Sequence, residues 1–543
     1  MKKITISIAS VALIAIGMFS FRQTTEKNHK QAGRRPNIVF IMSDDHAYQA
    51  ISAYSNRLTQ TPNIDRIAKE GMLFSNACVT NSICAPSRAV ILTGKHSHLN
   101  GKIDNNFPFD TTNVTFPQLL QANGYETAMF GKLHFGNSPK GFDEFKILPD
   151  QGDYYNPDFI TKKEGKKKII GYVTDIITDI TLNWLGKERD KEKPFFLAYL
   201  HKAPHREWLP AERHFKEFIN KKFPEPTTLF DKYEGRGSAS KQAEMNLLTH
   251  MNWAGDSKIR PENMDKLGIK ESHPYDKRNY NYTVGRMNAE QRKVWDTTYD
   301  KMNEEFIKNY PKMSDTDKMK WRYQRYMQDY LGCIASVDEG VGKVLDFLKE
   351  NGLEENTIVV YTSDQGFYLG EHGWFDKRFI FDESFKTPLL VKWPGVIKPS
   401  SKNSQMVQNL DFAQTFLEAA GVKAPADMQG ESLIPVFKGQ GKDFRDAAYY
   451  HYYEYPGIHM VKRHYGIVTE KYKLVHFYYD VDEWELYDRT NDKNELKNVY
   501  NDPKYTNVKA EMHKKLEALR IKYKDSEALD KMYIEKYKQL KRG

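Results

Sequence analysis

Four short apolar segments constrain the fold of this chain more than any other feature of its sequence. Each is followed within two residues by Asp, His, Lys or Gln, and they lie at residues 37–43, 125–130, 194–200 and 357–362. Helical patterns stand between them, for example at 115–123 and 322–351. Continuous apolar strands that alternate with helices predict an α/β domain whose sheet is largely parallel. Because ligands bind beyond the carboxyl ends of such strands, the four polar ends are expected to meet at one site.

The beginning of the chain is predicted to lie outside this fold. Residues 1–21 have a basic start followed by an apolar run, which is typical of a secretory signal peptide. A retained membrane anchor is the alternative, since the run is of borderline length for spanning a bilayer. Residues 22–35 are polar and basic and are interpreted as a linker. We therefore expect an exported protein, in the periplasm, secreted or at the cell surface, without stable membrane insertion.

The rest of the chain is predicted to form a large domain and a smaller one. Residues 36–428 hold the four apolar segments, and within them the polar, Tyr- and Trp-rich stretch 206–320 is interpreted as a helical insertion at the rim of the sheet. Residues 429–543 contain short alternating segments and one helical pattern, which predict an α+β domain with an antiparallel sheet. The expected strands are 447–455, 465–469, 473–479 and 483–487, and the expected helix is 508–523.

The amino-acid composition limits the kinds of molecule that this chain is expected to bind. The 543 residues include 81 Lys and Arg against 72 Asp and Glu, an excess of positive charge that is dilute over this length. It does not indicate a nucleic-acid partner, and it suits a polyanionic substrate. Three cysteines are too few for a disulfide framework.

The sharpest local signal is the string Cys84-Ala-Pro-Ser-Arg88. Pro86 suits the first turn of a helix and Gly94 suits its end. Cys84 would then lie at a helix N-terminus, where free N–H groups favour anions, and Arg88 would lie one turn along. The plain alternative is a buried cysteine in front of an ordinary helix.

Together with Leu92-Thr-Gly94, this string resembles the signature of the type I sulfatases. In that family the cysteine is oxidised after translation to formylglycine by a separate maturating enzyme. Further family motifs follow in the same order: Asp44-Asp45, Gly131-Lys132-Leu-His134, His201–His205, Asp364-Gln365-Gly366 and the region of Lys377. Gln365 stands where many members have Asn or His. The resemblance implies the alkaline-phosphatase-like fold, a mixed, largely parallel sheet flanked by helices.

An all-oxygen set of side chains indicates a metal site. It consists of Asp44, Asp45, Asp364 and the amide oxygen of Gln365. Several carboxylates suit a hard cation such as Ca²⁺ or Mg²⁺ better than zinc. A strand-ending turn is the alternative reading of the Asp pair. The resemblance implies calcium, with Mg²⁺ less expected, and it implies that the metal also touches the modified residue 84.

The resemblance also implies catalytic roles. One hydroxyl of the hydrated aldehyde at position 84 attacks sulfur, activated by the metal and Asp45, and the second allows sulfate to be expelled. His134 assists the second step, and His205 protonates the departing oxygen. The sulfate oxygens are held by Arg88, Lys132 and Lys377. The alternative for each His or Lys is an ordinary surface position. His201 is left outside the catalytic set.

The other two cysteines are predicted to be buried and unpaired. Cys78 lies close in sequence to Cys84, but a disulfide between them would block maturation.

Two stretches, 366–386 and 449–484, are similar to bacterial N-acetylglucosamine-6-sulfatases, also described as mucin-desulfating sulfatases. This similarity implies an exo-acting enzyme that removes the 6-O-sulfate of N-acetylglucosamine in heparin, heparan or mucin-type glycans. Asp376, Arg378 and His459 are the expected sugar contacts, because hydroxyls pair with carboxylate, guanidinium and imidazole groups. The alternative for these three is a solvated loop.

Three other functions remain open at this point. The first is another carbohydrate sulfatase, such as a uronate-2-O-sulfatase. The second is a phosphate or phosphonate monoester hydrolase of the same superfamily. The third is a glycan-binding protein with an unmodified Cys84, which would not need its acidic residues close together.

Overall fold

The computed structural model describes residues 35–542, with side chains to residue 539. The predicted signal peptide and all but the last residue of the predicted linker lie outside the described residues. Within the described range, no helix is long and apolar enough to cross a membrane.

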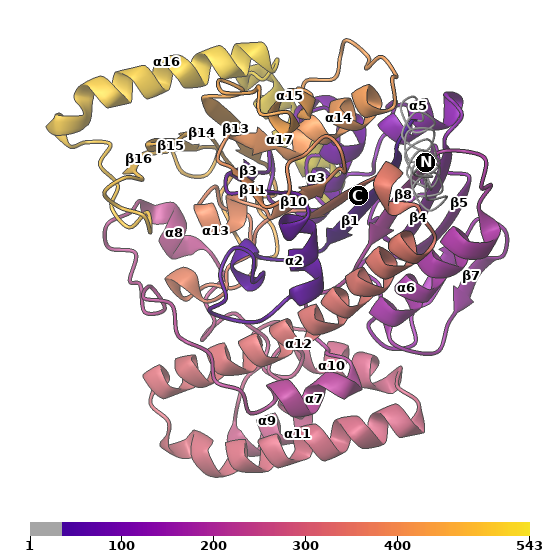
Figure 1. Cartoon of the computed structure of the whole chain (residues 1–543). Helices are drawn as coiled ribbons and strands as arrows, with labels where there is room; N and C mark the ends of the chain where they lie inside the picture. Colours follow the sequence, from indigo (N-terminus) through magenta and orange to yellow (C-terminus); the bar gives the residue numbers. More distant parts are fainter. Residues whose placement is uncertain (1–34, 543) are drawn as a thin grey trace, which may run out of the picture.

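A mixed sheet forms the centre of the molecule (Figure 1). In the described part of the chain it has ten strands, in the order β11-β2-β10-β9-β1-β8-β4-β5-β6-β7. Their bounds are β1 Asn37–Ser43, β2 Met72–Phe74, β4 Glu126–Lys132, β5 Glu144–Leu148, β6 Asp158–Thr161, β7 Gly165–Lys168, β8 Phe195–Leu200, β9 Thr357–Ser363, β10 Leu389–Lys392 and β11 Ser401–Asn403. The four predicted strands are β9, β1, β8 and β4, which are adjacent and parallel. The prediction of a largely parallel sheet is confirmed.

Both faces of the sheet are covered, which explains why its central strands are mainly apolar. Val39 and Ile41 of β1 point into one core, and Ile38, Phe40 and Met42 point into the other. One face is covered by α2 (Pro62–Lys69), α6 (Val173–Asn183) and α12 (Asp315–Glu350), and the other by α3 (Cys84–Thr93), α5 (Phe116–Ala122) and α14 (Phe412–Ala419). The helices predicted at 115–123 and 322–351 correspond to α5 and α12.

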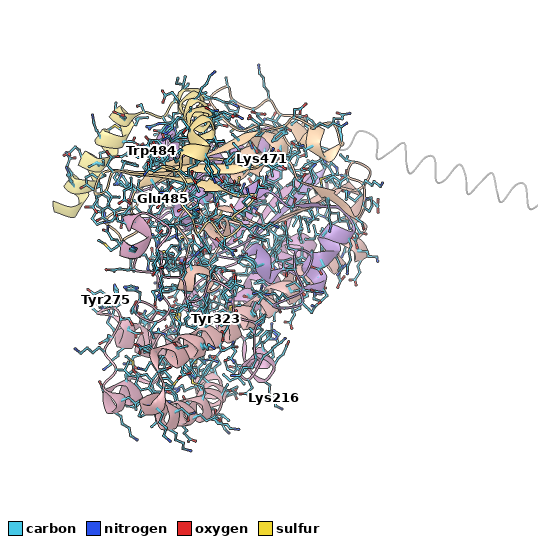
Figure 2. The ribbon with its side chains drawn as sticks, turned by 90° about the vertical axis from the view of Figure 1, so that its left-hand side faces the viewer. Lys216, Tyr275, Tyr323, Lys471, Trp484 and Glu485 are labelled. Atoms are coloured by element: carbon cyan, nitrogen blue, oxygen red, sulfur yellow. The ribbon has the colours of Figure 1, made fainter. Side chains whose placement is uncertain are left out.

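Between β8 and β9 the chain forms a group of helices at one end of the molecule (Figure 1). They are α7 Glu212–Phe218, α9 Pro261–Leu267, α10 Asp276–Gly285 and α11 Ala289–Asn309, whereas α8 (Ser238–Gln242) lies apart from them, beside the C-terminal sheet. The long helix α12 starts among them, where Ser314 and Asp317 form a capping box, and then runs on across the sheet. Figure 2 places Lys216 and Tyr275 on this helical part.

The C-terminal part forms a separate antiparallel sheet at the other end of the molecule. Its strands are β13 Ala447–Tyr452, β14 His464–Thr469, β15 Tyr472–Phe477 and β16 Glu483–Asp488, paired in chain order. The helices α16 (Thr506–Lys522) and α17 (Glu527–Arg542) follow. Trp484, labelled in Figure 2, packs against His513 of α16 with ring centroids 4.4 Å apart. The predicted antiparallel sheet is therefore present.

A buried ion pair ties this second sheet to the first domain. Arg445, just before β13, donates two hydrogen bonds of 2.7 Å to the two carboxylate oxygens of Asp411, just before α14. The Asp411 side chain is fully buried and that of Arg445 is 5% exposed.

Candidate active site

The acidic residues meet where two parallel strands end. Ser43 of β1 stands opposite Ser363 of β9, so Asp44 and Asp45 leave the sheet beside Asp364. The backbone N–H of Asp45 donates to Asp364 Oδ1 over 3.1 Å. One oxygen of each of the three carboxylates lies within 4.8 Å of the others. Adjacent strand ends have thus brought together residues that are more than three hundred positions apart.

The oxygens at this place fit a hard cation. Among the described residues, neither Asp44 Oδ1 nor Gln365 Oε1 has a hydrogen-bond partner, although both atoms are buried. Gln365 is held by its amide nitrogen, which donates to Asp45 Oδ1 over 2.5 Å. Burial raises the pKa of Asp45 to about 7 and that of Asp364 to about 6, and the neighbouring carboxylates add to both shifts. Orphaned oxygens and crowded carboxylates are the environment that a divalent cation relieves. The predicted metal ligands therefore lie together, and their oxygen atoms suit a divalent cation.

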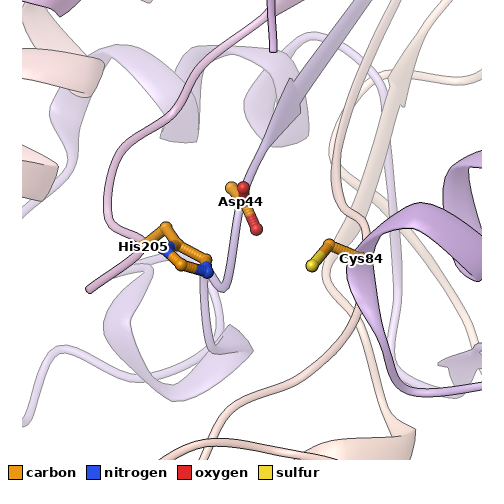
Figure 3. A group of neighbouring side chains, drawn as sticks. All are labelled: Asp44, Cys84 and His205. Carbon is orange, nitrogen blue, oxygen red and sulfur yellow. The ribbon is translucent and has the colours of Figure 1, made fainter. Parts of the chain in front are cut away.

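Cys84 opens helix α3 beside these carboxylates. Pro86 stands in its first turn, and Gly94 ends it with a φ of 61° and an N–H that donates to Val90 O over 2.8 Å, as predicted. In Figure 3 the Cys84 sulfur faces Asp44, and His205 lies on the other side of Asp44. Burial raises the pKa of the Cys84 thiol, which keeps it neutral and a poor nucleophile. The Sγ atom marks the place that an oxygen would take after oxidation.

Three buried cations face the three carboxylates. Arg88 Nε donates to Asp364 Oδ2 over 2.9 Å, and Lys132 forms an ion pair with Asp44. Lys377 Nζ donates to both oxygens of Asp45, over 2.7 and 2.8 Å. The predicted sulfate-binding side chains are thus at the same place as the predicted metal ligands.

A glutamine fixes the proton of His134. Lys132 Nζ can only donate, so its contact with Gln151 Oε1 sets the orientation of that amide. Gln151 Nε2 therefore donates to His134 Nε2 over 3.3 Å, which leaves the ring proton on Nδ1. Burial and then Lys132 hold the pKa of His134 well below its usual value. The neutral imidazole keeps an unprotonated nitrogen and can act as a base.

His205 is oriented by the backbone. Its Nδ1 donates to the Arg206 carbonyl oxygen over 2.5 Å, and its Nε2 lies 3.8 Å from Asp45 Oδ2. The Tyr154 hydroxyl donates to the carbonyl oxygen of His205 over 2.7 Å and holds the turn in place. Burial, reinforced by Lys132, keeps the pKa of His205 well below its usual value. A negatively charged ester beside Nε2 would favour the protonated ring.

The three expected sugar contacts form one buried cluster. Asp376 Oδ1 accepts from Arg378 Nε over 2.9 Å, and Asp376 Oδ2 lies 3.2 Å from His459 Nε2. They are 2%, 4% and 5% exposed, so the solvated-loop alternative is wrong. Asp376 and Arg378 have φ of 75° and 92°, as Asp45 and His134 have 65° and 66°. Non-glycine residues are rare in this left-handed region and gather at functional sites.

Sequence reasoning missed a connection between this cluster and residue 84. Arg378 Nη1 donates to Glu454 Oε1 over 2.5 Å, and Glu454 Oε2 accepts the backbone N–H of Asn105 over 3.0 Å. Asn105 Nδ2 lies 3.6 Å from Cys84 Sγ, and its Oδ1 accepts from the N–H of Ala85 over 3.3 Å. Asn105 lies in a loop with no periodic pattern, so no sequence signal pointed to it. Glu454 lies inside the stretch 449–484 that is similar to bacterial N-acetylglucosamine-6-sulfatases, but nothing in the sequence singled it out.

The remaining candidates lie outside the site. His201 is fully buried, and neither ring nitrogen has a hydrogen-bond partner in the described part of the chain. Cys78 and Cys333 are buried and free, as predicted.

Acidic strand ends gathered around a cysteine at a helix N-terminus, on a largely parallel sheet, define a hydrolase of alkaline-phosphatase-like fold. The family described as Sulfatase matches residues 36–422, and the one described as N-sulphoglucosamine sulphohydrolase, C-terminal, matches residues 370–522. The chain belongs to the sulfatase family, and it is a sulfuric ester hydrolase. This family implies a formylglycine and a divalent metal.

Individual relatives agree with this placement. The chain is 48% identical over 511 residues to an N-acetylglucosamine-6-O-sulfatase of Bacteroides thetaiotaomicron, covering 92% of this chain and 89% of that protein. A solved structure of a protein in complex with its substrate D-glucosamine-2-N,6-O-disulfate has a TM-score of 0.85 and 47% identity, over 90% of this chain and 98% of the other. A phosphonate monoester hydrolase of Agrobacterium radiobacter, 18% identical with a TM-score of 0.64 over 90% of this chain and 96% of that one, shares the fold alone.

Proposed function

We propose that this sulfatase removes the 6-O-sulfate of N-acetylglucosamine at the ends of heparin, heparan or mucin-type glycans. The observation that carries the proposal is the connection from Cys84 through Asn105 and Glu454 to Arg378 and Asp376. It joins a centre for sulfate chemistry to a cluster with the carboxylate, guanidinium and imidazole groups that bind sugar hydroxyls. The 48% identity to an N-acetylglucosamine-6-O-sulfatase, and the 47% identity to a protein whose substrate is D-glucosamine-2-N,6-O-disulfate, support the choice of sugar.

The cofactors we propose follow from the donor set. Asp44, Asp45, Asp364 and Gln365 would hold a calcium ion, together with residue 84. When bound, the cation polarises a sulfate oxygen, and a hydrated formylglycine at position 84 supplies the attacking hydroxyl. Maturation requires a formylglycine-generating enzyme as a partner.

The chain's own residues then position the ester and move protons. Arg88, Lys132 and Lys377 bind the sulfate oxygens and the charge that develops on them. His205 presents Nε2 to the departing sugar oxygen and donates its proton there. His134, whose Nε2 is kept unprotonated by Gln151, accepts a proton from residue 84 when sulfate leaves.

The domain and export assignments are also proposals. Residues 36–428 would form the catalytic domain with the helical insertion 206–320, and 429–543 would form the smaller domain that supplies Glu454 and His459. The start of the chain, residues 1–21, would direct export to the periplasm or cell surface.

A panel of defined substrates tests the function. Protein matured in a host with a formylglycine-generating enzyme is assayed for free sulfate or phosphate on 6-sulfated N-acetylglucosamine, a 2-sulfated uronate and a phosphate monoester. Mass spectrometry of the peptide containing residue 84 reports the aldehyde, and Cys84→Ala is the inactive control. Sulfate release from the first compound is expected. Release only from the second would overturn the choice of sugar, and phosphate release alone would overturn the proposed reaction.

A further inference from the structure

A cavity of about 440 Å³ adjoins the proposed catalytic centre. It lies between the loops that follow β5 and β8 and parts of the segment 244–286, and both His205 and His459 line it. Neither Cys84 nor the three carboxylates of the metal site belong to its wall. A substrate bound at the catalytic centre would therefore reach past His205 into this space.

The cavity contains one cation that lacks a counterion. Arg206 forms an ion pair with Asp256, and Arg286 Nε lies 3.2 Å from Asp153 Oδ2. Lys202 has no ion pair and its ammonium no hydrogen bond with any residue in the described range 35–539, although its side chain is almost fully buried, at 3% exposure. Its recorded contact is a cation–π interaction, with Nζ 4.7 Å from the centroid of the Tyr154 ring.

The ammonium of Lys202 is charged but has no neutralising partner. Burial, with Lys132 acting in the same direction, lowers the pKa of Lys202 to about 8, so it is mostly protonated at neutral pH. Asp44, Asp153 and Glu207 oppose this shift only from a distance, since none of them forms an ion pair with Lys202. A buried charge without a partner is destabilising, and a bound anion would relieve it.

The turn that carries Lys202 also carries the proposed proton donor. The N–H of His205 donates to the Lys202 carbonyl oxygen over 3.0 Å, and Tyr154, which lies under the ammonium, donates to the His205 carbonyl oxygen over 2.7 Å. An anion held by Lys202 would thus have a fixed position relative to the bond being cleaved.

We infer that Lys202 forms a second oxyanion site, which takes a sulfate group other than the one being hydrolysed. This inference rests on the proposed function only for the identity of the sugar. Two sources have the required chemistry: a second sulfate on the same saccharide, such as a 2-N-sulfate, and inorganic sulfate released by the reaction.

Kinetics with Lys202→Met separates the two sources. If the site binds a second sulfate of the saccharide, the variant loses a hydrogen bond to a charged group, and kcat/KM on 6-O-sulfated N-sulfoglucosamine falls about ten- to hundredfold. On 6-O-sulfated N-acetylglucosamine, which lacks that sulfate, kcat/KM falls less than about threefold. If it binds released sulfate, the inhibition constant of inorganic sulfate rises about tenfold or more and kcat/KM is unchanged. Lys202→Arg should keep most of either effect. The exposed Lys191 of the turn before β8 gives the matched control Lys191→Met.

Thermal unfolding supplies a readout that does not need turnover. In sulfate-free buffer Lys202→Met is expected to unfold at a higher temperature than the parent protein, because a buried unpaired charge is removed. Added sodium sulfate should then stabilise the variant less than the parent. Two results would overturn the proposed site. One is an equal loss of activity on both sugars with an unchanged inhibition constant for sulfate. The other is a lower unfolding temperature for Lys202→Met than for the parent protein in sulfate-free buffer. If formylglycine-containing parent protein releases no sulfate from either sugar, the proposed function fails, while the unfolding series still decides on Lys202.

Discussion

Asn105→Ala is the change that best tests how the centre works. It removes the contacts of the Asn105 amide with Cys84 Sγ, at 3.6 Å from Nδ2 and 3.9 Å from Oδ1, and the hydrogen bond from the Ala85 N–H to Oδ1 at 3.3 Å. Both partners are uncharged in the resting protein. The folded state should therefore lose only about 1 kcal/mol, the usual value for one helix-capping hydrogen bond.

The catalytic loss should be larger than the loss of stability. Residue 84 gains negative charge when its attacking hydroxyl is deprotonated, and again when its second hydroxyl loses a proton as sulfate is expelled, and a fixed donor beside it stabilises that charge. A hydrogen bond to a charged group is worth about 1.5–3 kcal/mol, so kcat should fall roughly ten- to hundredfold. KM should change by less than about threefold, because the donor acts mainly in the transition state.

The assay is sulfate release from 6-sulfated N-acetylglucosamine, compared at equal formylglycine content measured by mass spectrometry. Asn105→Asp keeps the acceptor for Ala85 but loses the donor, so it should lose as much activity as the alanine variant. The neighbouring Asn106 is exposed and its hydrogen bond to Asp104 uses only its backbone N–H, which makes Asn106→Ala the matched control. A kcat for Asn105→Ala within about twofold of the parent value, or an equal loss in the control, would refute the reasoning.

Three further outcomes are expected. His205→Ala should lower kcat about 10²- to 10⁴-fold on the sugar sulfate but far less on 4-nitrophenyl sulfate, whose leaving group needs no proton, and equal losses would exclude a general acid at this position. Chelation should stop sulfate release, and Ca²⁺ should restore it better than Mg²⁺ in the same assay; full activity after chelation would rule out the metal. Arg445→Met should cost about 3–5 kcal/mol in denaturant unfolding by leaving Asp411 buried and unpaired, whereas Lys515→Met, at the exposed pair with Asp446, should cost under about 1 kcal/mol. Similar costs for the two would contradict this.

The centre of the sheet could be predicted because burial on both faces leaves a plain signal. β1 and β9 are buried from end to end and mainly apolar, and their predicted bounds match the structure to within one residue. The outer strands gave no such signal. β7 (Gly165–Lys168) is exposed at every residue, and its sequence is typical of a charged loop. The start of α12 was also missed, since its first turns lie among the polar helices before β9 and lack a continuous apolar face.

Apart from what the family resemblance implies, only those site residues could be predicted that have a metal-binding side chain and also directly follow a buried strand. Asp44, Asp45, Asp364 and Gln365 directly follow buried strands, so their meeting follows from the topology. Asn105 and Glu454 lie in irregular segments 349 positions apart, and only tertiary folding brings them to the same hydrogen bond. Lys202 belongs to the motif His201–His205, but its lack of a counterion depends on the folded cavity and could not be predicted from the sequence.

The charges of the centre suggest why metal and sulfate belong together. Asp44, Asp45 and Asp364 carry three negative charges, and Arg88, Lys132 and Lys377 carry three positive ones at close range. With all three carboxylates ionised these six charges sum to zero, and a divalent cation alone would leave an excess of two positive charges in a buried place. A sulfate dianion restores neutrality, whereas a singly charged sulfate ester does not, so the field of the centre favours the group as it is released from residue 84. Each of the two ions therefore lowers the cost of burying the other, and by linkage the gain is mutual. Lys202 adds one more unpaired positive charge beyond His205, and it extends the same field along the wall on which the rest of the glycan would lie.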